Sequence, residues 1–308
     1  MKKEILKRYE RNALITVDDV PYSCKRVYNP GAVKFKGEYL LLLRTDTDIP
    51  LGSCLGLAVS KDGYNFHVEK EPVMVANKEE GAIYDPRITQ IGETYYIFYA
   101  TDSSSGIQLG LASTRDFHTF DRVSLSEPDL RNGVLFPEKI GGYYVRLDRP
   151  FPLYSDPLRG FDIWISYSPD LVFWGRSKLL LAAKDCSWGK NKIGPGAVPI
   201  KTKEGWLIIF HGVEIDDRVK GWNKIYRLGC ALLDLEDPSK VKGVYKNPIL
   251  EPRDKYEING YRPNAIFTCG AITEENGEVK IYYGAADQCI AVATAKLKDL
   301  VSSCVQKV

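Results

Sequence analysis

Residues 81–88 read GAIYDPRI, and this stretch decides the fold because its Asp85–Pro86 pair has counterparts along the whole chain. A proline also stands beside an apolar run in NPGAV, FPEKI, GPGAV and RPNAI, where the prolines occupy positions 30, 137, 195 and 263. Successive prolines of this set, Pro86 included, are 51 to 68 residues apart. We interpret this spacing as one structural unit used five times.

Each unit continues with two further apolar runs. The second run follows a glycine-containing turn and is rich in aromatic and β-branched residues, as in YLLLLRTD, YYIFYATD, YYVRLDRP, WLIIFHGV and VKIYYGAAD. The third runs are LGLAVS, LGLAST, IWISYS, LGCALL and IAVATA. Short runs of this kind, bounded by Gly, Asp and Pro and repeated roughly every 55 residues, are typical of β-propeller blades. The sequence therefore predicts an all-β fold, a five-bladed β-propeller with a short N-terminal extension, as a single domain over residues 1–308.

The prolines indicate where each blade begins. Proline has no N–H to donate to a strand ladder, so it is tolerated at the first residue of a strand and biases the preceding residue toward extended geometry. We therefore expect the residue before each proline to lie at the start of an innermost strand, next to the propeller axis. On this basis the blades begin near Asn29, Asp85, Phe136, Gly194 and Arg262.

Asp85 is the first candidate for a catalytic acid, because a carboxylate at this position would face the mouth of the central funnel. The alternative is a purely structural role, since Asp-Pro commonly initiates turns. The dipeptide by itself leaves both interpretations open.

Three second runs end in a cationic or protonatable residue at an equivalent place. Arg44 follows four leucines, Arg149 closes the run of the third unit, and His211 closes that of the fourth. Taken singly, each arginine could reach to solvent from a strand end and the histidine could be a neutral core residue. Their recurrence at one strand position favours a shared site. Lys139 competes with Arg149 for a place in that site, and strand position favours Arg149.

Further candidates flank the same positions. A charged insertion, residues 214–227, is expected on the same rim as a lid or as a contact in a homo-oligomer. The individual residues that we add to the site are Tyr84, Arg131, Lys192 and Asp287, the last of which ends the second run of the fifth unit.

Composition excludes several classes of function. The 308 residues are 44% hydrophobic and 27% charged, as in an ordinary soluble globular protein. A net charge of +2 argues against a nucleic-acid partner. The N-terminal MKKEILKRYERNALI lacks the apolar run of a signal peptide or membrane span, so we expect a cytoplasmic protein. Without metal-ligand spacing or a glycine-rich phosphate loop, no metal and no nucleotide cofactor is expected.

An excess of cationic residues around one carboxylate limits the classes of reaction that the site could catalyse. Inverting glycoside hydrolysis needs a second carboxylate roughly 6.5–9.5 Å from the first to activate water. Converging arginine and lysine side chains instead bind phosphate through charge-assisted hydrogen bonds. Phosphate held in this way is already anionic, so it can act as a nucleophile without a base.

At this point the sequence resembles glycoside hydrolase family 130, the β-mannoside phosphorylases and related mannosidases. The resemblance covers nearly the whole chain and rests on NPGAV, YDPRI, RNGVLFPEKIGGYYVRLDRP, KIGPGAVPI, FHG and YYGAAD. It implies cleavage of mannosyl-glucose or manno-oligosaccharides by inorganic phosphate as co-substrate, with inversion to α-mannose 1-phosphate and with no other cofactor. It also implies that Asp85 is the general acid, acting directly or through the 3-hydroxyl of the mannosyl ring. The residues implied to bind phosphate are Arg44, Arg131, Arg149 and His211, and those implied to bind the sugar are Asn29, Lys192 and Asp287, beside Tyr84.

Two alternatives remain at the level of sequence. A β-mannoside hydrolase on the same fold would need an added glutamate base, for which Glu79, Glu80 and Glu214 are the candidates. A non-catalytic carbohydrate-binding propeller would need aromatic platforms instead, and the candidates for these are Tyr84, Trp188 and Trp222.

Overall fold

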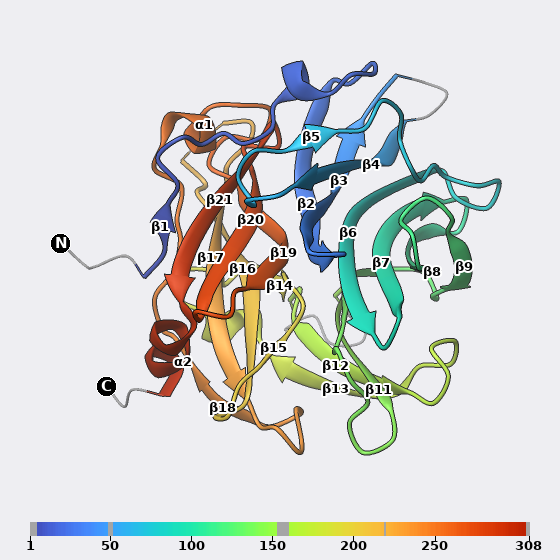
Figure 1. Ribbon diagram of the computed structural model, residues 1–308. Coiled ribbons are helices and arrows are strands. Elements are labelled where there is room, and N and C mark those ends of the chain that lie inside the picture. The colour runs from blue at the N-terminus through green and yellow to red at the C-terminus, as the bar shows by residue number, and fades with distance from the viewer. Residues whose placement is uncertain (1–4, 49–51, 153–159, 219, 306–308) are drawn as a thin grey trace.

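The five predicted blades are present as five separate antiparallel sheets arranged around one axis (Figure 1). The computed structural model describes residues 5–48, 52–152, 160–218 and 220–305. In the described residues the innermost strands β2, β6, β10 and β14 contact one another in turn, and β19 contacts β2 and β6 and meets blade 4 through β16 and β17. The predicted five-bladed propeller is therefore confirmed.

The strands of each blade follow one another outward from the axis. Blade 1 comprises β2 (Arg26–Phe35), β3 (Glu38–Asp46), β4 (Ser53–Ser60) and β5 (His67–Val68). Blade 2 comprises β6 (Ala82–Ile91), β7 (Thr94–Ser103), β8 (Gly106–Thr114) and β9 (Asp121–Leu125). Blade 3 comprises β10 (Leu130–Leu135), β11 (Tyr144–Pro150), β12 (Ile163–Ser168) and β13 (Gly175–Leu181).

The last two blades depart slightly from this pattern. Blade 4 comprises β14 (Lys192–Pro195), β16 (Trp206–Ile215), β17 (Lys224–Leu233) and β18 (Val241–Val244), and β15 (Ile200–Lys201) also pairs with β16. Blade 5 comprises β19 (Ile266–Thr273), β20 (Glu278–Ala285) and β21 (Cys289–Lys296), and its outermost strand is β1 (Lys7–Arg8) from the N-terminus. Helix α1 (Lys255–Ile258) precedes blade 5, and α2 (Leu297–Val305) follows it.

The N-terminal extension closes the ring. In addition to the pairing of β1 with β21, Ile15 bridges to Ile290. Arg8 of β1 forms a buried two-bond ion pair with Glu257 of α1, with Nε–Oε1 and Nη2–Oε2 distances of 2.8 and 2.9 Å. Blade 5, built from the C-terminal part of the chain, thus takes its outermost strand from the N-terminus.

Five apolar clusters lie between neighbouring blades and form the core. The run of four leucines in β3 shows why the strands are apolar on both faces. Leu40 and Leu42 pack with residues of blade 2, whereas Leu41 and Leu43 pack with residues of blade 5. Alternate residues of a strand point to opposite faces, so a blade between two others needs a continuous apolar run.

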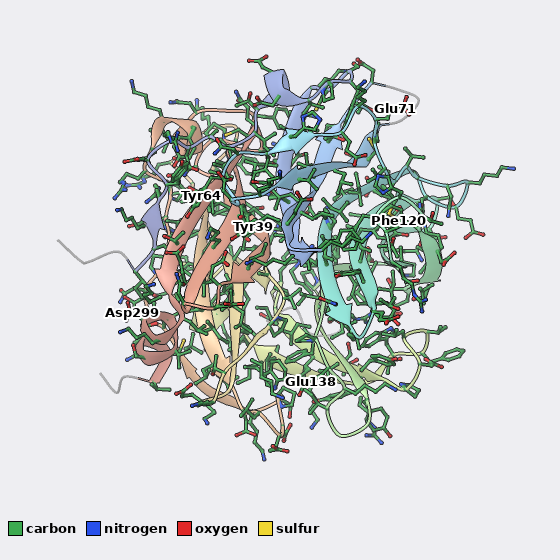
Figure 2. All side chains as sticks on the ribbon, in the orientation of Figure 1. Tyr39, Tyr64, Glu71, Phe120, Glu138 and Asp299 are labelled. Atoms are coloured by element: carbon green, nitrogen blue, oxygen red, sulfur yellow. The ribbon has the colours of Figure 1, made fainter. Side chains whose placement is uncertain are left out.

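A polar cluster seals the junction between blades 5 and 1. The Tyr39 hydroxyl donates to Glu274 Oε1 at 2.5 Å, and the buried Lys280 ammonium donates to the same oxygen at 2.9 Å. Lys280 also lies over the rings of Tyr39 and Tyr64, which Figure 2 labels on this side of the molecule. The hydrogen bonds to Lys34, Tyr39 and Lys280 outweigh burial and lower the pKa of Glu274 to about 2. This carboxylate is therefore charged at neutral pH.

Two of the predicted blade starts are wrong, and the prolines act differently from the expectation. Phe136 follows the end of β10, and Arg262 precedes β19 by four residues in a turn region. Pro30 and Pro86 lie within β2 and β6, where the strand register shifts. An unpaired residue at such a β-bulge has no ladder bond to lose, so proline is tolerated inside the strand. None of the helices in the described ranges is long and apolar enough to cross a membrane.

Candidate active site

The bulges of three innermost strands place polar side chains beside the axis. The register shifts fall between Tyr28 and Gly31, between Tyr84 and Arg87, and between Arg131 and Val134. The first residues of these bulges have positive φ, at 48° for Asn29, 56° for Asp85 and 58° for Asn132. This region costs a non-glycine residue on the order of 1 kcal/mol or more, and such strain concentrates at functional sites.

All three side chains line one pocket of about 140 Å³ at the axis. Eight of the nine predicted site residues line it, and the ninth, Tyr84, does not. Its full lining is Asn29, Arg44, Asp85, Arg131, Asn132, Arg149, Lys192, His211, Trp222, Tyr226, Ala265, Phe267 and Asp287. The repeat thus converges from all five blades on a single cavity.

Asp85 is buried and held through one carboxylate oxygen. Asn29 donates from Nδ2 to Asp85 Oδ1 at 2.9 Å, and Arg44 donates from Nη1 to the same oxygen at 3.3 Å. Arg44 is itself fixed, because its Nε donates to Asp46 Oδ1 at 3.1 Å. Its guanidinium lies between the rings of Tyr28 and Tyr84, 4.4 and 4.5 Å from their centroids. Asp85 therefore has a fixed orientation, with Oδ2 outside these two bonds.

Tyr84 supports the pocket from behind instead of lining it. Its ring is buried, its hydroxyl donates to Asp102 Oδ1 at 2.8 Å, and Arg131 Nη2 donates to that hydroxyl at 2.7 Å. Tyr84 thereby orients Arg44 by ring contact and Arg131 by a hydrogen bond. Tyr84 is absent from the described lining of the pocket, and its direct contact with a sugar stays a prediction from sequence.

Arg149 and His211 present unpaired donors to the pocket. Both are buried, and within the part of the chain that the structure describes neither Arg149 Nε nor either ring nitrogen of His211 has a hydrogen-bond partner. Burial and the nearby Arg131 lower the pKa of Arg149 to about 9, which still leaves it charged at neutral pH. Burial and the Arg149 charge lower the pKa of His211 well below its usual value, so this ring is neutral. Unpaired buried donors of this kind are costly unless a ligand completes them.

Lys139, the competitor of Arg149, lies outside the pocket. Its side chain is exposed, and its ammonium lies 4.2 Å from the ring centroid of Tyr144. Arg149 is thus the residue of this pair that faces the site, in agreement with its strand position.

The second acidic residue of the pocket, besides Asp85, is Asp287. Asp287 lies in the turn after β20 at φ 50°, two residues beyond the strand that it was expected to end. Burial and the nearby Asp85 raise the pKa of Asp287 to about 6, against the opposing effect of Arg44. Lys192 stands on the cationic side, and burial and Arg149 lower its pKa to about 7. The lining carries four cationic side chains, Arg44, Arg131, Arg149 and Lys192, against these two carboxylates.

The glutamates that a hydrolase would need are engaged elsewhere. Glu80 is buried and accepts hydrogen bonds from Tyr99 and Arg122 in blade 2. Glu214 pairs with Arg227 at 2.9 Å, and Glu79 is exposed. None of the three appears in the described lining of the pocket.

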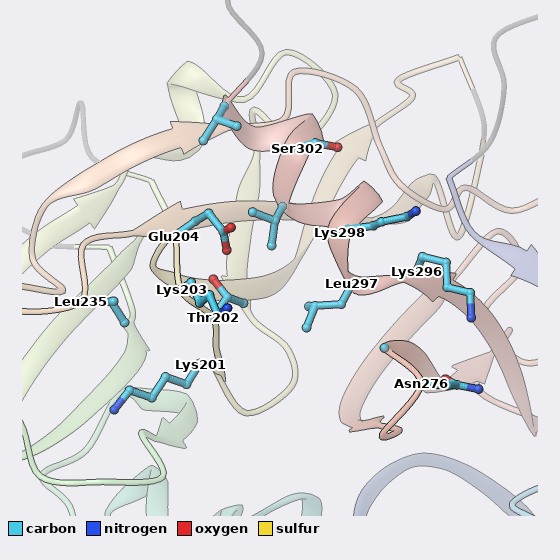
Figure 3. A pocket seen from close by; sticks show the side chains of 13 residues that line it. Lys201, Thr202, Lys203, Glu204, Leu235, Asn276, Lys296, Leu297, Lys298 and Ser302 are labelled. Atoms are coloured by element: carbon cyan, nitrogen blue, oxygen red, sulfur yellow. The ribbon is translucent and has the colours of Figure 1, made fainter.

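A larger groove lies away from the axis. It has a volume of about 1050 Å³ and runs between α2 and the turns of blades 4 and 5 (Figure 3). Lysines dominate its charged lining, among them Lys201, Lys296 and Lys298. No buried side-chain polar atom without a hydrogen-bond partner, among the described residues, belongs to this groove, whereas five such atoms belong to the axial pocket. Size therefore does not identify the functional site here.

The sequence missed Asn132, Tyr226, Ala265 and Phe267. Asn132 had a signal, because Asn132–Gly133 precedes the apolar VLF as Asn29–Pro30 precedes the apolar run of the first unit. Tyr226 lies in the charged insertion 214–227, which was expected on this rim, but nothing in the sequence singled it out. Phe267 carried no signal, because it lies in an apolar run. The ring of His211 lies between them, 6.1 and 4.5 Å from their centroids.

Comparisons with known proteins agree with this geometry. The family model described as β-1,4-mannooligosaccharide phosphorylase matches residues 2–306. The chain is 40% identical to the 1,2-β-oligomannan phosphorylase of a Thermoanaerobacter species, over 89% of this chain and 91% of that protein. It is 32% identical to the β-1,4-mannooligosaccharide phosphorylase of Ruminococcus albus, over 97% and 90% of the two chains. The solved structure of a Listeria innocua β-1,2-mannobiose phosphorylase with β-1,2-mannobiose superposes with a TM-score of 0.85 at 32% identity, covering 97% and 99%.

Proposed function

We propose that this chain, which belongs to glycoside hydrolase family 130, is an enzyme that cleaves β-mannosides by phosphorolysis. The relatives at 30–40% identity that span most of their own length are named as phosphorylases of β-mannosides. The observation in this molecule that carries the proposal is the group of unpaired donors on Arg149 and His211, in the same pocket as the fixed carboxyl group of Asp85. An anion with several acceptor oxygens would satisfy them.

The proposed reaction forms one bond and breaks one. A phosphate oxygen, held by Arg44, Arg131, Arg149 and His211, attacks C1 of the mannosyl ring from the face opposite the departing group. The C1–O bond to the acceptor breaks, and its electron pair stays on the acceptor oxygen, which takes the proton of Asp85. The products are α-mannose 1-phosphate, with inversion at C1, and an acceptor shortened by one mannosyl unit. Asp85 is protonated again from solvent before the next turnover.

Several features suit these roles. Both hydrogen bonds of Asp85 end on Oδ1, which leaves Oδ2 to carry the transferable proton. His211 is neutral, so it can donate one hydrogen bond to phosphate without adding charge. Asn29, Lys192 and Asp287 are proposed to bind the mannosyl ring, while Tyr84 positions Arg44 and Arg131.

The linkage that we propose is β-1,2. Two relatives at 40% and 42% identity are named for β-1,2-linked substrates, whereas those named for β-1,4 linkages are 32% and 31% identical. Cytoplasmic location, a homo-oligomeric state and independence of any cofactor besides phosphate remain predictions from sequence.

The test is cleavage of β-1,2- and β-1,4-mannobiose with and without inorganic phosphate. We expect mannose 1-phosphate from the β-1,2 substrate and only when phosphate is present. Free mannose at an equal rate in phosphate-free buffer would establish hydrolysis instead. In Arg149→Ala the KM for phosphate should rise at least about tenfold more than the KM for the mannoside, because hydrogen bonds to charged groups contribute about 1.5–3 kcal/mol.

A further inference from the structure

Arg87 is a buried arginine beside the pocket to which the proposed reaction gives no role. It is 1% exposed and lies on β6, two residues after Asp85, where the ladder with β7 resumes beyond the bulge. Arg87 is absent from the described lining of the pocket, yet its guanidinium lies 5.7 Å from the ring centroid of Phe267, which belongs to that lining. The side chain is therefore next to the site without facing it.

All three nitrogens of the Arg87 guanidinium donate to backbone carbonyls. Nη1 donates to the Asp85 carbonyl at 2.8 Å, Nε to the Gly196 carbonyl at 3.1 Å and Nη2 to the Pro195 carbonyl at 3.3 Å. Because Pro195 ends β14, the side chain reaches from the innermost strand of blade 2 to that of blade 4. Arg87 thus connects two blades that follow one another in the chain only through blade 3.

Both ends of this connection border groups of the proposed mechanism. At one end the Asp85 carbonyl belongs to the bulge that turns the carboxyl group into the pocket. At the other end the acceptor carbonyls directly follow Gly194, which pairs with His211 in the ladder of blade 4. A Cβ on Gly194 would lie 2.5 Å from His211 Cε1 and 3.4 Å from Arg149 Cδ, so both side chains pack closely against this backbone. Arg87 therefore joins the backbone of the proposed general acid to the backbone beside two proposed phosphate-binding residues.

The charge of Arg87 has no carboxylate beside it. In the part of the chain that the structure describes, the guanidinium is bonded to carbonyls and forms no ion pair. Burial of a charge in this way is costly, and a neutral amide could also donate to carbonyls. Burial, the Arg149 charge and then the Arg87 charge lower the pKa of His211 well below its usual value, so the field of Arg87 acts inside the pocket. A phosphate anion in the pocket would offset this positive charge.

We propose that Arg87 is a positioning residue, which holds the Asp85 bulge in place relative to the phosphate site so that acid and nucleophile act on the same glycosidic bond. The inference rests on the proposed phosphorolysis. In that reaction the leaving oxygen takes its proton as a phosphate oxygen attacks C1, and small displacements of reacting groups are expensive in rate. Only the planar, forked guanidinium combines the charge with donors in this arrangement, because lysine is a compact charge and glutamine is neutral.

The experiment compares two donors in Arg87→Lys and Arg87→Gln at saturating phosphate. One donor is β-mannobiose, whose leaving oxygen needs the Asp85 proton, and the other is β-mannosyl fluoride, whose leaving group departs without it. We expect both variants to lower kcat on β-mannobiose at least about tenfold more than on the fluoride, because the fluoride does not depend on the position of the acid. The KM for phosphate should rise more in Arg87→Gln than in Arg87→Lys, since only the glutamine removes the charge.

Arg146→Lys is the matched control. Arg146 is a 3% exposed arginine of β11, its Nε donates to Asp148 at 2.9 Å, and it is absent from the described lining of the pocket. A general loosening of the propeller should change the rates on both donors by one common factor in this variant. Thermal unfolding of each variant establishes that folded protein is assayed, and Arg87→Lys decides the test if Arg87→Gln does not fold.

The outcomes separate the two proposals. If the wild-type protein phosphorolyses neither donor, the proposed function fails. If wild type is active but Arg87→Lys loses the same factor on both donors, or separates them no more than Arg146→Lys does, Arg87 does not position the acid. A raised KM for phosphate as the sole effect would limit Arg87 to anion binding and would overturn the inference. Loss of folding in both Arg87 variants would assign the side chain to stability alone and would overturn it too.

Discussion

At the scale of single residues, the same β-bulge explains both the positive φ of Asp85 and its two hydrogen bonds. The bulge sets φ at 56° and turns the carboxyl group toward the axis, where Asn29 and Arg44 meet it. Aspartate and asparagine tolerate this backbone region better than most residues because their short polar side chains bond locally. The backbone at position 85 therefore also accepts asparagine. The substitution Asp85→Asn can test proton donation without disturbing the fold.

Asp85→Asn should preserve folding and remove most activity on a natural β-mannoside. The amide keeps an acceptor for Asn29 and Arg44 but has no proton for the leaving oxygen, and general acid catalysis typically contributes about 10²–10⁴-fold. A mannosyl donor whose leaving group departs without a proton, such as a fluoride or dinitrophenolate, should be partly rescued. Both rates are measured at saturating phosphate. A similar fractional loss on the two donors would mean that Asp85 binds or braces rather than donates.

Lys192 predicts a pH dependence of phosphate binding. Its pKa is lowered to about 7, so the ammonium is present below pH 7 and is lost as the pH rises through that value. Its charge adds to that of Arg149, so in wild type its contribution to phosphate affinity should decline above pH 7. In Lys192→Arg this decline should be absent, because the guanidinium stays charged.

The measurement is the dissociation constant for inorganic phosphate between pH 6 and pH 9 in both proteins. Titration of phosphate itself affects the two equally, so their ratio isolates residue 192. We expect the ratio to change by less than about tenfold across pH 7, because Lys192 adds charge beside the phosphate site without a direct contact, which would be worth about tenfold or more. A ratio that stays constant over this range would remove Lys192 from the phosphate environment.

At the scale of elements, β14 and β16 show how backbone space sets the position of a side chain. Gly194 of β14 pairs with His211 of β16, and a Cβ at position 194 would lie 2.5 Å from His211 Cε1. The glycine lets the histidine ring stay in the pocket, against Phe267. This contact is thus made within blade 4, between Gly194 on the innermost strand and His211 on the second strand.

Gly194→Ala should displace His211, raise the KM for phosphate and destabilise the protein by about 1–3 kcal/mol, as overpacking usually does. In the His211→Ala background the same substitution should have a much smaller effect on stability, because the clashing ring is gone. Gly175→Ala serves as the control, since an added Cβ there meets no atom within 4 Å. Equal destabilisation by Gly194→Ala in both backgrounds would contradict the contact.

At the scale of the whole molecule, the ring is closed by a two-residue strand and a buried ion pair. Arg8 and Glu257 side chains are 4% and 0% exposed, and the Tyr283 hydroxyl of blade 5 also donates to Glu257 at 2.8 Å. A strand as short as β1 has few ladder bonds. We infer that side-chain bonds carry much of the closure.

Glu257→Gln should lower the free energy of unfolding by up to about 3–5 kcal/mol, because it removes the buried counter-charge of Arg8 and leaves the more exposed Asp254 carboxylate, 3.6 Å from Arg8 Nε, to balance it. Urea unfolding measures the change. Glu138→Gln is the matched control, since Glu138, labelled in Figure 2, pairs with Lys201 at 2.6 Å while 45% exposed. That pair should contribute no more than about 1 kcal/mol. Similar losses of unfolding free energy in Glu257→Gln and Glu138→Gln would show that burial does not determine how much the Arg8–Glu257 pair contributes to stability.

The sequence by itself determined the features that depend on local periodicity. Apolar runs bounded by Gly, Asp and Pro repeat along the chain, so the number of blades and the position of each second strand could be read directly. The equivalence of Arg44, Arg149 and His211 followed from the same repeat, because residues at one register position of each second strand lie at one height along the axis. These three residues meet in the pocket for this reason.

Only the tertiary structure decided what depends on pairing between strands and between blades. A bulge depends on how two strands pair, which a single sequence does not show. The sequence therefore placed Pro86 at the start of a strand, although it lies inside β6. For the same reason it placed Phe136 and Arg262 at the starts of innermost strands. Tyr84 and Asp85 are neighbours in the chain, yet the bulge turns one behind the pocket wall and the other into the pocket. Which way a strand-end side chain faces is set by the neighbouring blade, and that contact joins residues distant in sequence.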